Sequence, residues 1–434
     1  MASSSDESTD TRLLKAALIG NLKLLKKLAA ELDYGEGFAK TFVGVKDAED
    51  RTALHFAAVG GRTRICKYLI EELKLDVNMK DGKGATALLH ATLGQHFPTT
   101  VYLLENGANP TLADDKGFSA LHFAADKGCK ELMRLLISKG AEVDAKSDFG
   151  TPLQCAAAKG KKEAIKILLD NNANPNSVCH HIFTPLAVSI LAKSFECSKM
   201  LLKARADPNL GSCGVTPLGI AASEGETEVI KCLLKAGANP NFTNYYGLTP
   251  LEIAALHGNH DGLMILFPVT SQIPTIPNWS VGGIIKHIHS KEAREQREHK
   301  EKENFLLSKS KGEDAFKRKD YVNAIYWYTQ AINADPSDAT VLSNRSLCWA
   351  CLNEGRRALS DAEACVLLRP NWPKAYYREG VAWKLLKNFV RAADSFSDAL
   401  KLDPENEELQ NALREAVQAE FGVPLGENLA VMHL

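Results

Sequence analysis

A short motif recurs at nearly constant spacing through the first half of this 434-residue chain, and this repeat constrains the fold more than any other feature. Each copy has Thr, once Ser, followed by Pro or Ala and then Leu, and consecutive copies lie 32 to 34 residues apart. A fixed period of this length is typical of solenoids, in which each unit packs only on its neighbours. We therefore expect a stack of similar helical units. The copies begin at Thr52, Thr86, Ser119, Thr151, Thr184, Thr216 and Thr249.

The motif predicts where a helix begins in each unit. A Thr or Ser hydroxyl can accept a hydrogen bond from a free N–H at the helix start, and Pro fits the first turn, which needs no donor. An Ala-rich stretch follows each motif, and most units close on Gly-Ala-x-x-Asn or Asp or on a close variant of it. These features resemble the ankyrin repeat over residues 11–267, with about eight repeats of which the first and last cap the array. His55 and His122 then belong to the fold and not to a catalytic or metal site.

The resemblance implies that partners bind to the exposed helix row and the turn tips, because neighbouring repeats bury the rest. The tips become aromatic toward the C-terminal half, and exposed aromatic side chains are typical anchors for a protein. The alternative is that some of these side chains fold back onto the next repeat. The predicted partner surface consists of Phe149, His180, His181, Phe183, Tyr245, Tyr246, Leu191 and Leu256.

The sequence of residues 268–304 indicates a junction between two domains. Three prolines, the first at Pro268 and the last at Pro277, break the helical pattern. A run of alternating charges follows from Lys291 to Asn304 and suits a solvated helix that leads into the second domain. Residues 1–10 and 422–434 are expected to be tails.

A second repeat, with a period of 34, surrounds Pro336, Pro370 and Pro404. Small residues such as Gly380 alternate with large ones such as Phe396, and this pattern resembles the tetratricopeptide repeat (TPR), which pairs antiparallel helices. The units are 305–338, 339–372 and 373–406, with a capping helix at 407–421 within a domain that spans 305–421. The predicted fold class is all-α, with two α-solenoids in series.

The TPR resemblance also implies a ligand site. In co-chaperone members of the family, five groove residues form a clamp for the carboxylates of a C-terminal aspartate. Four of the five positions match here and the fifth, an Asn in the family, is Glu. That carboxylate can repel an acidic ligand, or pair with the Lys four residues before it. The clamp positions are Lys309, Glu313, Asn344, Lys374 and Arg378.

Composition excludes several classes of function. A net charge of -1 gives no global field that would attract nucleic acid. No nucleophile and base, phosphate loop or metal cluster stands out, so we expect no enzyme, metal or cofactor.

Cys348 and Cys351 form a single CxxC on a predicted helix, and we expect reduced thiols. The N-terminal sequence lacks the features of a secretory signal, which favours a cytoplasmic protein, with a nuclear pool left open.

Together these features resemble plant ankyrin-TPR proteins. The resemblance implies a co-chaperone-like adaptor whose TPR groove binds the acidic C-terminus of seventy- or ninety-kilodalton heat-shock chaperones, while the ankyrin repeats bind a client. The alternative is a scaffold whose groove binds a different peptide, or an internal segment, independently of chaperones.

Overall fold

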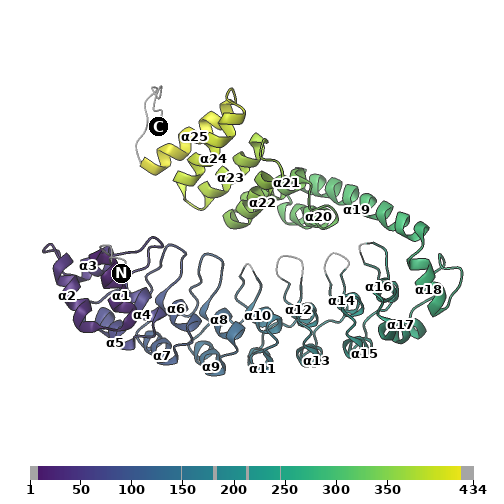
Figure 1. Cartoon of the computed structure of the whole chain (residues 1–434), viewed down its shortest axis with the longest axis horizontal. Helices are drawn as coiled ribbons and strands as arrows, with labels where there is room; N and C mark the ends of the chain where they lie inside the picture. Colours follow the sequence, from purple (N-terminus) through teal and green to yellow (C-terminus); the bar gives the residue numbers. More distant parts are fainter. Residues whose placement is uncertain (1–7, 148, 179–182, 212–214, 245, 422–434) are drawn as a thin grey trace, which may run out of the picture. The chain divides into compact units, whose positions relative to one another are not determined.

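The computed structural model describes all residues except 1–7, 148, 179–182, 212–214, 245 and 422–434. Throughout that part the secondary structure is helical, and isolated β-bridges such as Ala113 with Ser119 take the place of strands. The helices form two arrays that follow one another along the chain (Figure 1). The predicted all-α class with two solenoids in series is confirmed.

Antiparallel helix pairs, one for each predicted ankyrin repeat, build the first array. A short helix that the sequence did not predict, α3 (Phe38–Gly44), follows the first pair. The pairs are α1 (Thr9–Ile19) with α2 (Leu22–Leu32), α4 (Ala53–Val59) with α5 (Thr63–Lys67) and its π-helical continuation η1 (Tyr68–Glu72), α6 (Ala87–Leu93) with α7 (Phe97–Glu105), α8 (Ala120–Lys127) with α9 (Lys130–Ser138), α10 (Pro152–Ala158) with α11 (Lys162–Asp170), α12 (Pro185–Leu191) with α13 (Phe195–Lys203), α14 (Pro217–Glu224) with α15 (Thr227–Lys235), and α16 (Pro250–Leu256) with α17 (His260–Leu266) and the 3-10 turn η2 (Phe267–Val269).

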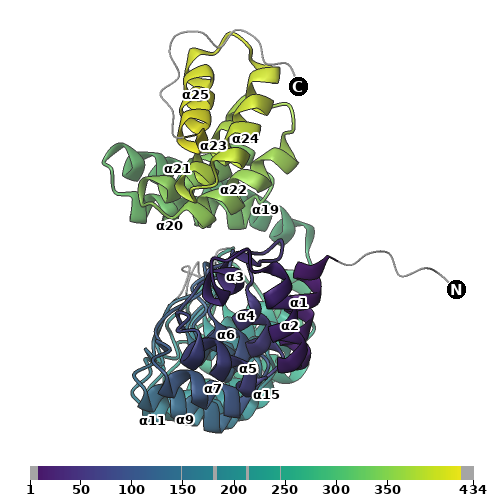
Figure 2. The ribbon, with the colours of Figure 1, turned by 90° about the vertical axis from the view of Figure 1, so that its left-hand side faces the viewer.

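The repeated Thr or Ser is the N-cap of the first helix in its repeat, as the motif predicted. The Thr184 hydroxyl accepts from the Ala187 N–H at 3.1 Å, and the Thr216 hydroxyl accepts from the Gly219 N–H at the same distance. Pro occupies the first helical position in four of these helices, where it costs no hydrogen bond. Successive repeats therefore start in the same way and stack behind one another (Figure 2).

The histidines of the motif tie each repeat to the next. The Ser119 N–H donates to Nδ1 of His122 at 3.0 Å, so the ring carries its proton on Nε2, which donates to the Gly150 carbonyl at 3.1 Å. His55 makes the equivalent pair of bonds. Both rings are buried. As predicted, these histidines serve the fold.

In two of the repeats without His, Gln154 and Glu252 make the bond to the cap. In the next repeat Gln154 accepts from the Thr151 N–H at 2.8 Å through Oε1 and donates to the Phe183 carbonyl at 2.5 Å through Nε2. Near the end of the array Glu252 accepts from the Thr249 N–H at 2.9 Å. The other three repeats have Leu89, Ala187 and Gly219 at this position, so a side-chain acceptor is frequent there but not essential.

One continuous core runs from Leu13 to Ile288 and extends beyond the predicted end of the array at residue 267. Helix α18 (Val281–Ile288) buries Ile284 and Ile288 in that core, and the Phe267 and Trp279 rings stack at 5.4 Å. Two Ile side chains four residues apart lie on one helix face, which explains why this segment packs. The segment predicted as the start of a linker therefore belongs to the first compact unit, which ends at Ile288.

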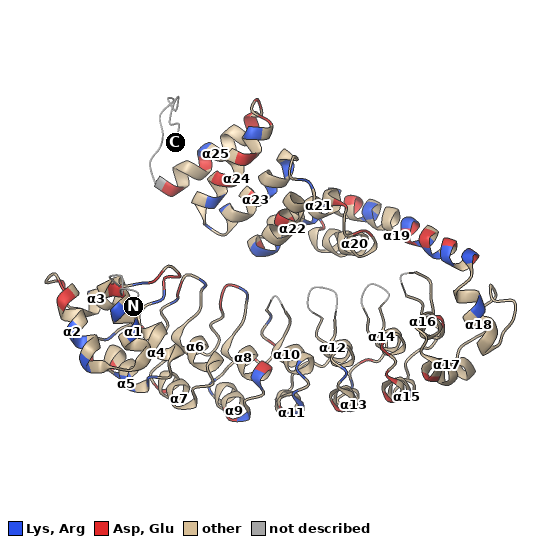
Figure 3. Ribbon diagram, viewed as in Figure 1, with Lys and Arg blue, Asp and Glu red and all other residues tan. Residues whose placement is uncertain are grey.

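The second compact unit contains the other helices. The charged run is helical, as predicted, and it is continuous with the first TPR helix; Figure 3 shows both signs of charge along it. Two of its ion pairs are Lys291 with Glu295 at 3.6 Å and Lys300 with Glu303 at 2.9 Å. The helices are α19 (Lys291–Lys317), α20 (Tyr321–Ala334), α21 (Ala339–Cys351), α22 (Gly355–Leu368), α23 (Pro373–Leu385), α24 (Phe389–Leu402) and α25 (Glu407–Phe421).

Glycine allows the paired helices of the second unit to approach closely. A Cβ added at Gly312 would lie 2.6 Å from the Tyr328 ring, and one added at Gly380 would lie 2.5 Å from the Phe396 ring. Such distances are well below van der Waals contact. The alternation of small and large residues in the sequence therefore reflects direct packing between the two helices of each pair.

We predict that His122→Gln makes the first array less sensitive to acid. Burial lowers the pKa of His122 to about 4, whereas an unfolded His titrates near 6.5. The unfolded chain therefore binds a proton between these values while the folded chain does not, so stability is complete above about pH 6.5 and falls as the pH drops toward 4. At pH 5 this histidine should reduce the free energy of unfolding by about 2 kcal/mol.

Because Gln154 makes the same bonds in the next repeat, the variant should match the wild type at pH 8 and exceed its stability at pH 5. Urea denaturation at the two pH values measures both quantities. Equal pH dependence in the two proteins would contradict the assignment.

Candidate functional site

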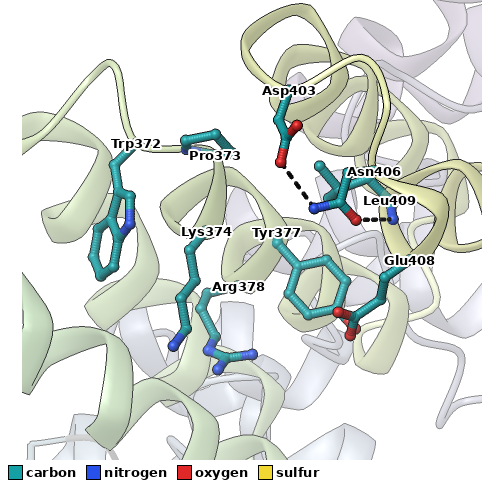
Figure 4. A pocket seen from close by; sticks show the side chains of 9 residues that line it. All are labelled: Trp372, Pro373, Lys374, Tyr377, Arg378, Asp403, Asn406, Glu408 and Leu409. Carbon is teal, nitrogen blue, oxygen red and sulfur yellow. Dashed lines mark hydrogen bonds between the residues drawn. The ribbon is translucent and has the colours of Figure 1, made fainter.

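Two basic residues of α23, Lys374 and Arg378, lie one helical turn apart and line a pocket of about 540 Å³ (Figure 4). Both side chains extend in the same direction in this view, and the start of α25 forms the opposite wall. The remaining lining residues are Trp372, Pro373, Tyr377, Asp403, Asn406, Glu408 and Leu409.

The surroundings of this pair favour the binding of an anion. Arg378 is 9% exposed, and its buried Nε has no hydrogen-bond partner within the described part of the chain. Burial lowers the pKa of Arg378. Burial also lowers the pKa of Lys374, and the nearby Arg378 charge adds to that shift. Lys374 itself is exposed, so the cost falls mainly on Arg378. A buried guanidinium next to a second cation costs free energy, and a bound carboxylate would offset that cost.

The acidic residues of the pocket have partners of their own. Burial raises the pKa of Tyr377 to about 12, and a hydrogen bond with Glu408 contributes to the shift. Asp403 accepts from the Asn406 amide at 2.9 Å. In the described residues, neither Lys374 nor Arg378 has a carboxylate within ion-pair distance, although the charge of Glu408 acts on both. The two cations therefore remain available to a ligand.

Lys309, the first predicted clamp residue, has an internal counter-ion. Its Nζ lies 2.9 Å from Oδ2 of Asp338, and the two side chains are 26% and 16% exposed. Asp338 also caps α21 by accepting from the Thr340 N–H at 2.8 Å. The sequence had suggested that Lys309 could pair with Glu313; that interpretation is wrong, because Asp338, which lies 29 residues away, holds the ammonium group.

Glu313 and Asn344 line a second, smaller pocket of about 200 Å³. The five predicted clamp residues thus fall into three groups: Glu313 with Asn344, Lys374 with Arg378, and Lys309 with its own counter-ion. The pocket is completed by Phe316, Lys317, Tyr328 and Leu347.

The neighbour of Asn344 has a structural role that sequence analysis missed. Arg345 donates to both carboxylate oxygens of Asp361, at 2.8 and 2.7 Å, and to the Thr329 hydroxyl at 2.9 Å. Asp361 is buried. Asn344 and Arg345 are therefore adjacent in sequence but differ in role, since one lines a pocket and the other joins three helices. In the sequence, the available signal for this ion pair was an Asp in the following helix, 16 residues after Arg345.

The predicted partner surface of the first array is only partly exposed. Phe149 is 73% exposed, Leu191 43% and Tyr246 38%. Phe183 and Leu256 are half-buried and pack against the core, which agrees with the alternative that some of these side chains fold back onto the array. His180, His181 and Tyr245 lie outside the described residues. Two exposed apolar residues at equivalent helix ends, Val59 and Leu93, were not included in the predicted set.

No helix in the described ranges combines the length and apolar character needed to cross a bilayer. Nor do these ranges contain a group of three or more His, Cys, Asp or Glu side chains that could hold a metal ion.

Comparison with protein families identifies both arrays. Ankyrin-repeat profiles match residues 49–82, 71–147, 121–212 and 186–274, the last three as sets of three copies. A profile described as "Serine/threonine-protein kinase BSK1-like, TPR repeats" matches residues 287–380. A solved structure, the human ASB11 ankyrin repeat domain, is 30% identical with a TM-score of 0.47, covering 52% of this chain and all of that one.

The chain is also similar to curated proteins over part of its length. The Hsp70-Hsp90 organizing protein of Triticum aestivum is 35% identical over 129 residues, which are 30% of this chain and 22% of that protein. Hsp70-Hsp90 organizing protein 2 of Arabidopsis thaliana is 41% identical over 129 residues, or 30% and 23% of the two chains. U-box domain-containing protein 70 of Oryza sativa is 35% identical over 140 residues, or 32% and 17%. The matches span about a fifth of these relatives.

We predict that Arg345→Ala destabilises the second unit by about 3–5 kcal/mol, because it leaves the buried Asp361 carboxylate without its counter-ion. Arg414→Ala, which removes an exposed arginine from α25, should change stability by less than about 0.5 kcal/mol. Urea denaturation followed by circular dichroism measures both. A similar small effect in the two variants would show that the ion pair does not hold the helices together.

Proposed function

We propose that this member of the ankyrin-repeat family, which also carries a TPR domain, is a non-enzymatic, co-chaperone-like adaptor in the cytoplasm. In this proposal the TPR groove binds the acidic C-terminal peptide of seventy- or ninety-kilodalton heat-shock chaperones. The ankyrin repeats bind a client or target protein. The chemistry on both surfaces is recognition of a polypeptide.

The observation that carries the proposal is the pair Lys374 and Arg378. A guanidinium and an ammonium group one turn apart can hold one or two carboxylates through charge-assisted hydrogen bonds, each worth about 1.5–3 kcal/mol. The Nε of Arg378 is a buried donor without a partner among the residues that the structure describes, and a peptide carboxylate could satisfy it. Similarity to proteins named for organizing Hsp70 and Hsp90 supports the choice of ligand.

Lys309 and Asn344 would contribute less than the pair on α23. Binding through Lys309 requires the ligand to share or replace its contact with Asp338. Asn344 can donate its amide to a carboxylate, but it lies beside the Glu313 carboxylate in the same pocket. These two contacts should therefore limit affinity for a purely acidic tail.

The alternative function, a scaffold that binds a different peptide independently of chaperones, is favoured by Glu313. A carboxylate in the groove opposes an acidic ligand by about 1–4 kcal/mol at contact distance. The two proposals differ in one respect that can be measured, since only the first requires the free C-terminal carboxylate of the peptide.

We predict that Lys374→Ala weakens binding of a peptide ending in Glu-Glu-Val-Asp by roughly ten- to hundredfold, because one charge-assisted bond of about 1.5–3 kcal/mol is lost. Amidation of the peptide terminus should cause a similar loss in the wild type. Isothermal titration of the full-length chain measures both. Lys401→Ala, which removes an exposed lysine from α24, is the matched control and should bind as the wild type does.

If the wild type binds the free and amidated peptides equally, or if Lys374→Ala has no effect, the acidic-tail proposal fails and the scaffold function replaces it. Raised salt should weaken the wild-type complex, since its contacts are partly exposed.

For the ankyrin repeats we propose a partner surface on the exposed residues of the predicted set, Phe149, Leu191 and Tyr246. The half-buried Phe183 and Leu256 would contribute at its edge, and His180, His181 and Tyr245 remain predictions. Exposed aromatic and aliphatic side chains are frequent anchors at protein interfaces.

We predict that the double variant Phe149→Ser and Leu191→Ser leaves the thermal midpoint within about 2 °C of the wild type, whereas Phe183→Ser lowers it by at least about 3 °C. The same double variant should lose the partners that cross-link to the ankyrin array of the wild type, which quantitative mass spectrometry measures. Retention of all cross-linked partners would place the interface elsewhere.

A further inference from the structure

The smaller pocket of the second unit has walls and a charge that differ from those of the Lys374 pocket. Its volume is about 200 Å³, and Phe316, Tyr328 and Leu347 provide apolar surface. The polar groups in its lining include the Glu313 carboxylate and the Asn344 amide. These two come from different helices, α19 and α21, so the pocket is a feature of the folded unit and not of one segment.

The Glu313 carboxylate is exposed to a ligand and has no counter-ion. Across the described ranges it makes no ion pair, because Lys309, its neighbour one turn earlier, is held by Asp338. The Glu313 charge also affects Tyr328, which lines the same pocket. Burial is the main cause that raises the pKa of Tyr328, and the charges of Cys348 and Glu313 raise it further, whereas a hydrogen bond with Asn344 lowers it. Glu313 therefore lies close to the ring and faces the same space.

The basic residue in the lining, Lys317, makes no ion pair with this carboxylate within the described residues. Lys317 lies one turn after Glu313 on α19, and its ammonium group is 3.8 Å from Asp314. It is exposed. The carboxylate that lines this pocket is therefore unpaired within the described residues, whereas the other pocket is lined by the two cations Lys374 and Arg378.

Such a pocket suits a long basic side chain. The aliphatic part of Lys or Arg can lie along Leu347 and the two aromatic rings, and its charged end can meet the carboxylate and the amide oxygen of Asn344. A ligand carboxylate in the same place would meet a like charge. Apolar walls with a single carboxylate are thus complementary to a cation with an apolar stem.

We propose that the Glu313 pocket binds a Lys or Arg side chain of the same peptide whose acidic group is held by Lys374 and Arg378. The inference rests on the proposed function for the acidic half of the ligand and adds a basic half. The ligand is then a peptide that carries both signs of charge, and Glu313 is the residue that selects it over a purely acidic tail.

The test compares matched peptides on the full-length chain. A parent peptide, Gly-Gly-Gly-Gly-Glu-Glu-Val-Asp, is accompanied by a series in which one Arg replaces each of the first five residues in turn. A parallel series carries citrulline, which has the shape of Arg without its charge. Fluorescence anisotropy gives the ratio of the two dissociation constants at each position.

At the best position the wild type should bind the Arg peptide about tenfold more tightly than the citrulline peptide, as expected for one charge-assisted contact. Glu313→Gln should reduce this ratio to about one, and Glu313→Asp, which keeps the charge, should retain part of it. Glu303→Gln removes a carboxylate from an exposed site on the same helix and should leave the ratio unchanged. Circular dichroism melts verify that all variants are folded.

The outcomes separate this inference from the proposed function. If the parent peptide binds and depends on Lys374 while every Arg-to-citrulline ratio stays near one, the Glu313 inference is overturned and the proposed function stands. If the ratio is high but unchanged by Glu313→Gln, the cation binds elsewhere and the inference is again overturned. If no peptide in either series depends on Lys374, both fall, because the inference requires one peptide to occupy both pockets.

Discussion

The first array depends on a polar bridge at the start of the first helix, which is present in six of its seven motif-bearing repeats and, among the described residues, absent at Thr86. A Thr or Ser side chain marks where the helix begins, and in four of the repeats the third residue of the helix also accepts from the backbone of the cap. In three of the repeats that residue, His55, His122 or Gln154, also reaches a carbonyl of the following repeat. A single repeat cannot bury its apolar face alone, so the array is stable only when these starts are in register. The bridge therefore sets the spacing of the stack, and the exposed surfaces follow from it.

In the second unit, some charged side chains are paired within the fold and others are available to a ligand. Arg345 with Asp361 and Lys309 with Asp338 are satisfied within the fold. Lys374 and Arg378 are not paired with a carboxylate in the described part of the chain, and Arg378 has a buried donor without an acceptor. Because burying an unpaired charge is costly, such a site is retained only where something offsets the cost, and a bound carboxylate would do so. This asymmetry among residues of like charge is the basis of the proposed adaptor function.

The sequence predicted the parts of this molecule that depend on local chemistry. The N-caps, the role of His55 and His122, and the helical form of the charged run all follow from residue types at short spacing. What it missed depends on contacts between distant residues: Asp338 is 29 residues from Lys309, and the packing of α18 on the array requires a partner surface that no local pattern reveals. Phe183 illustrates the same limit, since an aromatic residue at a turn tip has the same sequence signature whether it faces solvent or the core. The repeat register was enough to single out Glu313, Asn344, Lys374 and Arg378, which line the two pockets, but not to predict the pairing of Lys309 with Asp338.

The most direct measurement of the central claim is the side-chain NMR signal of Arg378. Its Nε–H has no acceptor within the described residues of the free protein, so a bound peptide carboxylate should shift this resonance downfield and slow its exchange with water. The account predicts that change on titration with a free-carboxylate acidic peptide and its absence with the amidated form. An Arg378 resonance that stays constant while other signals report binding would contradict it.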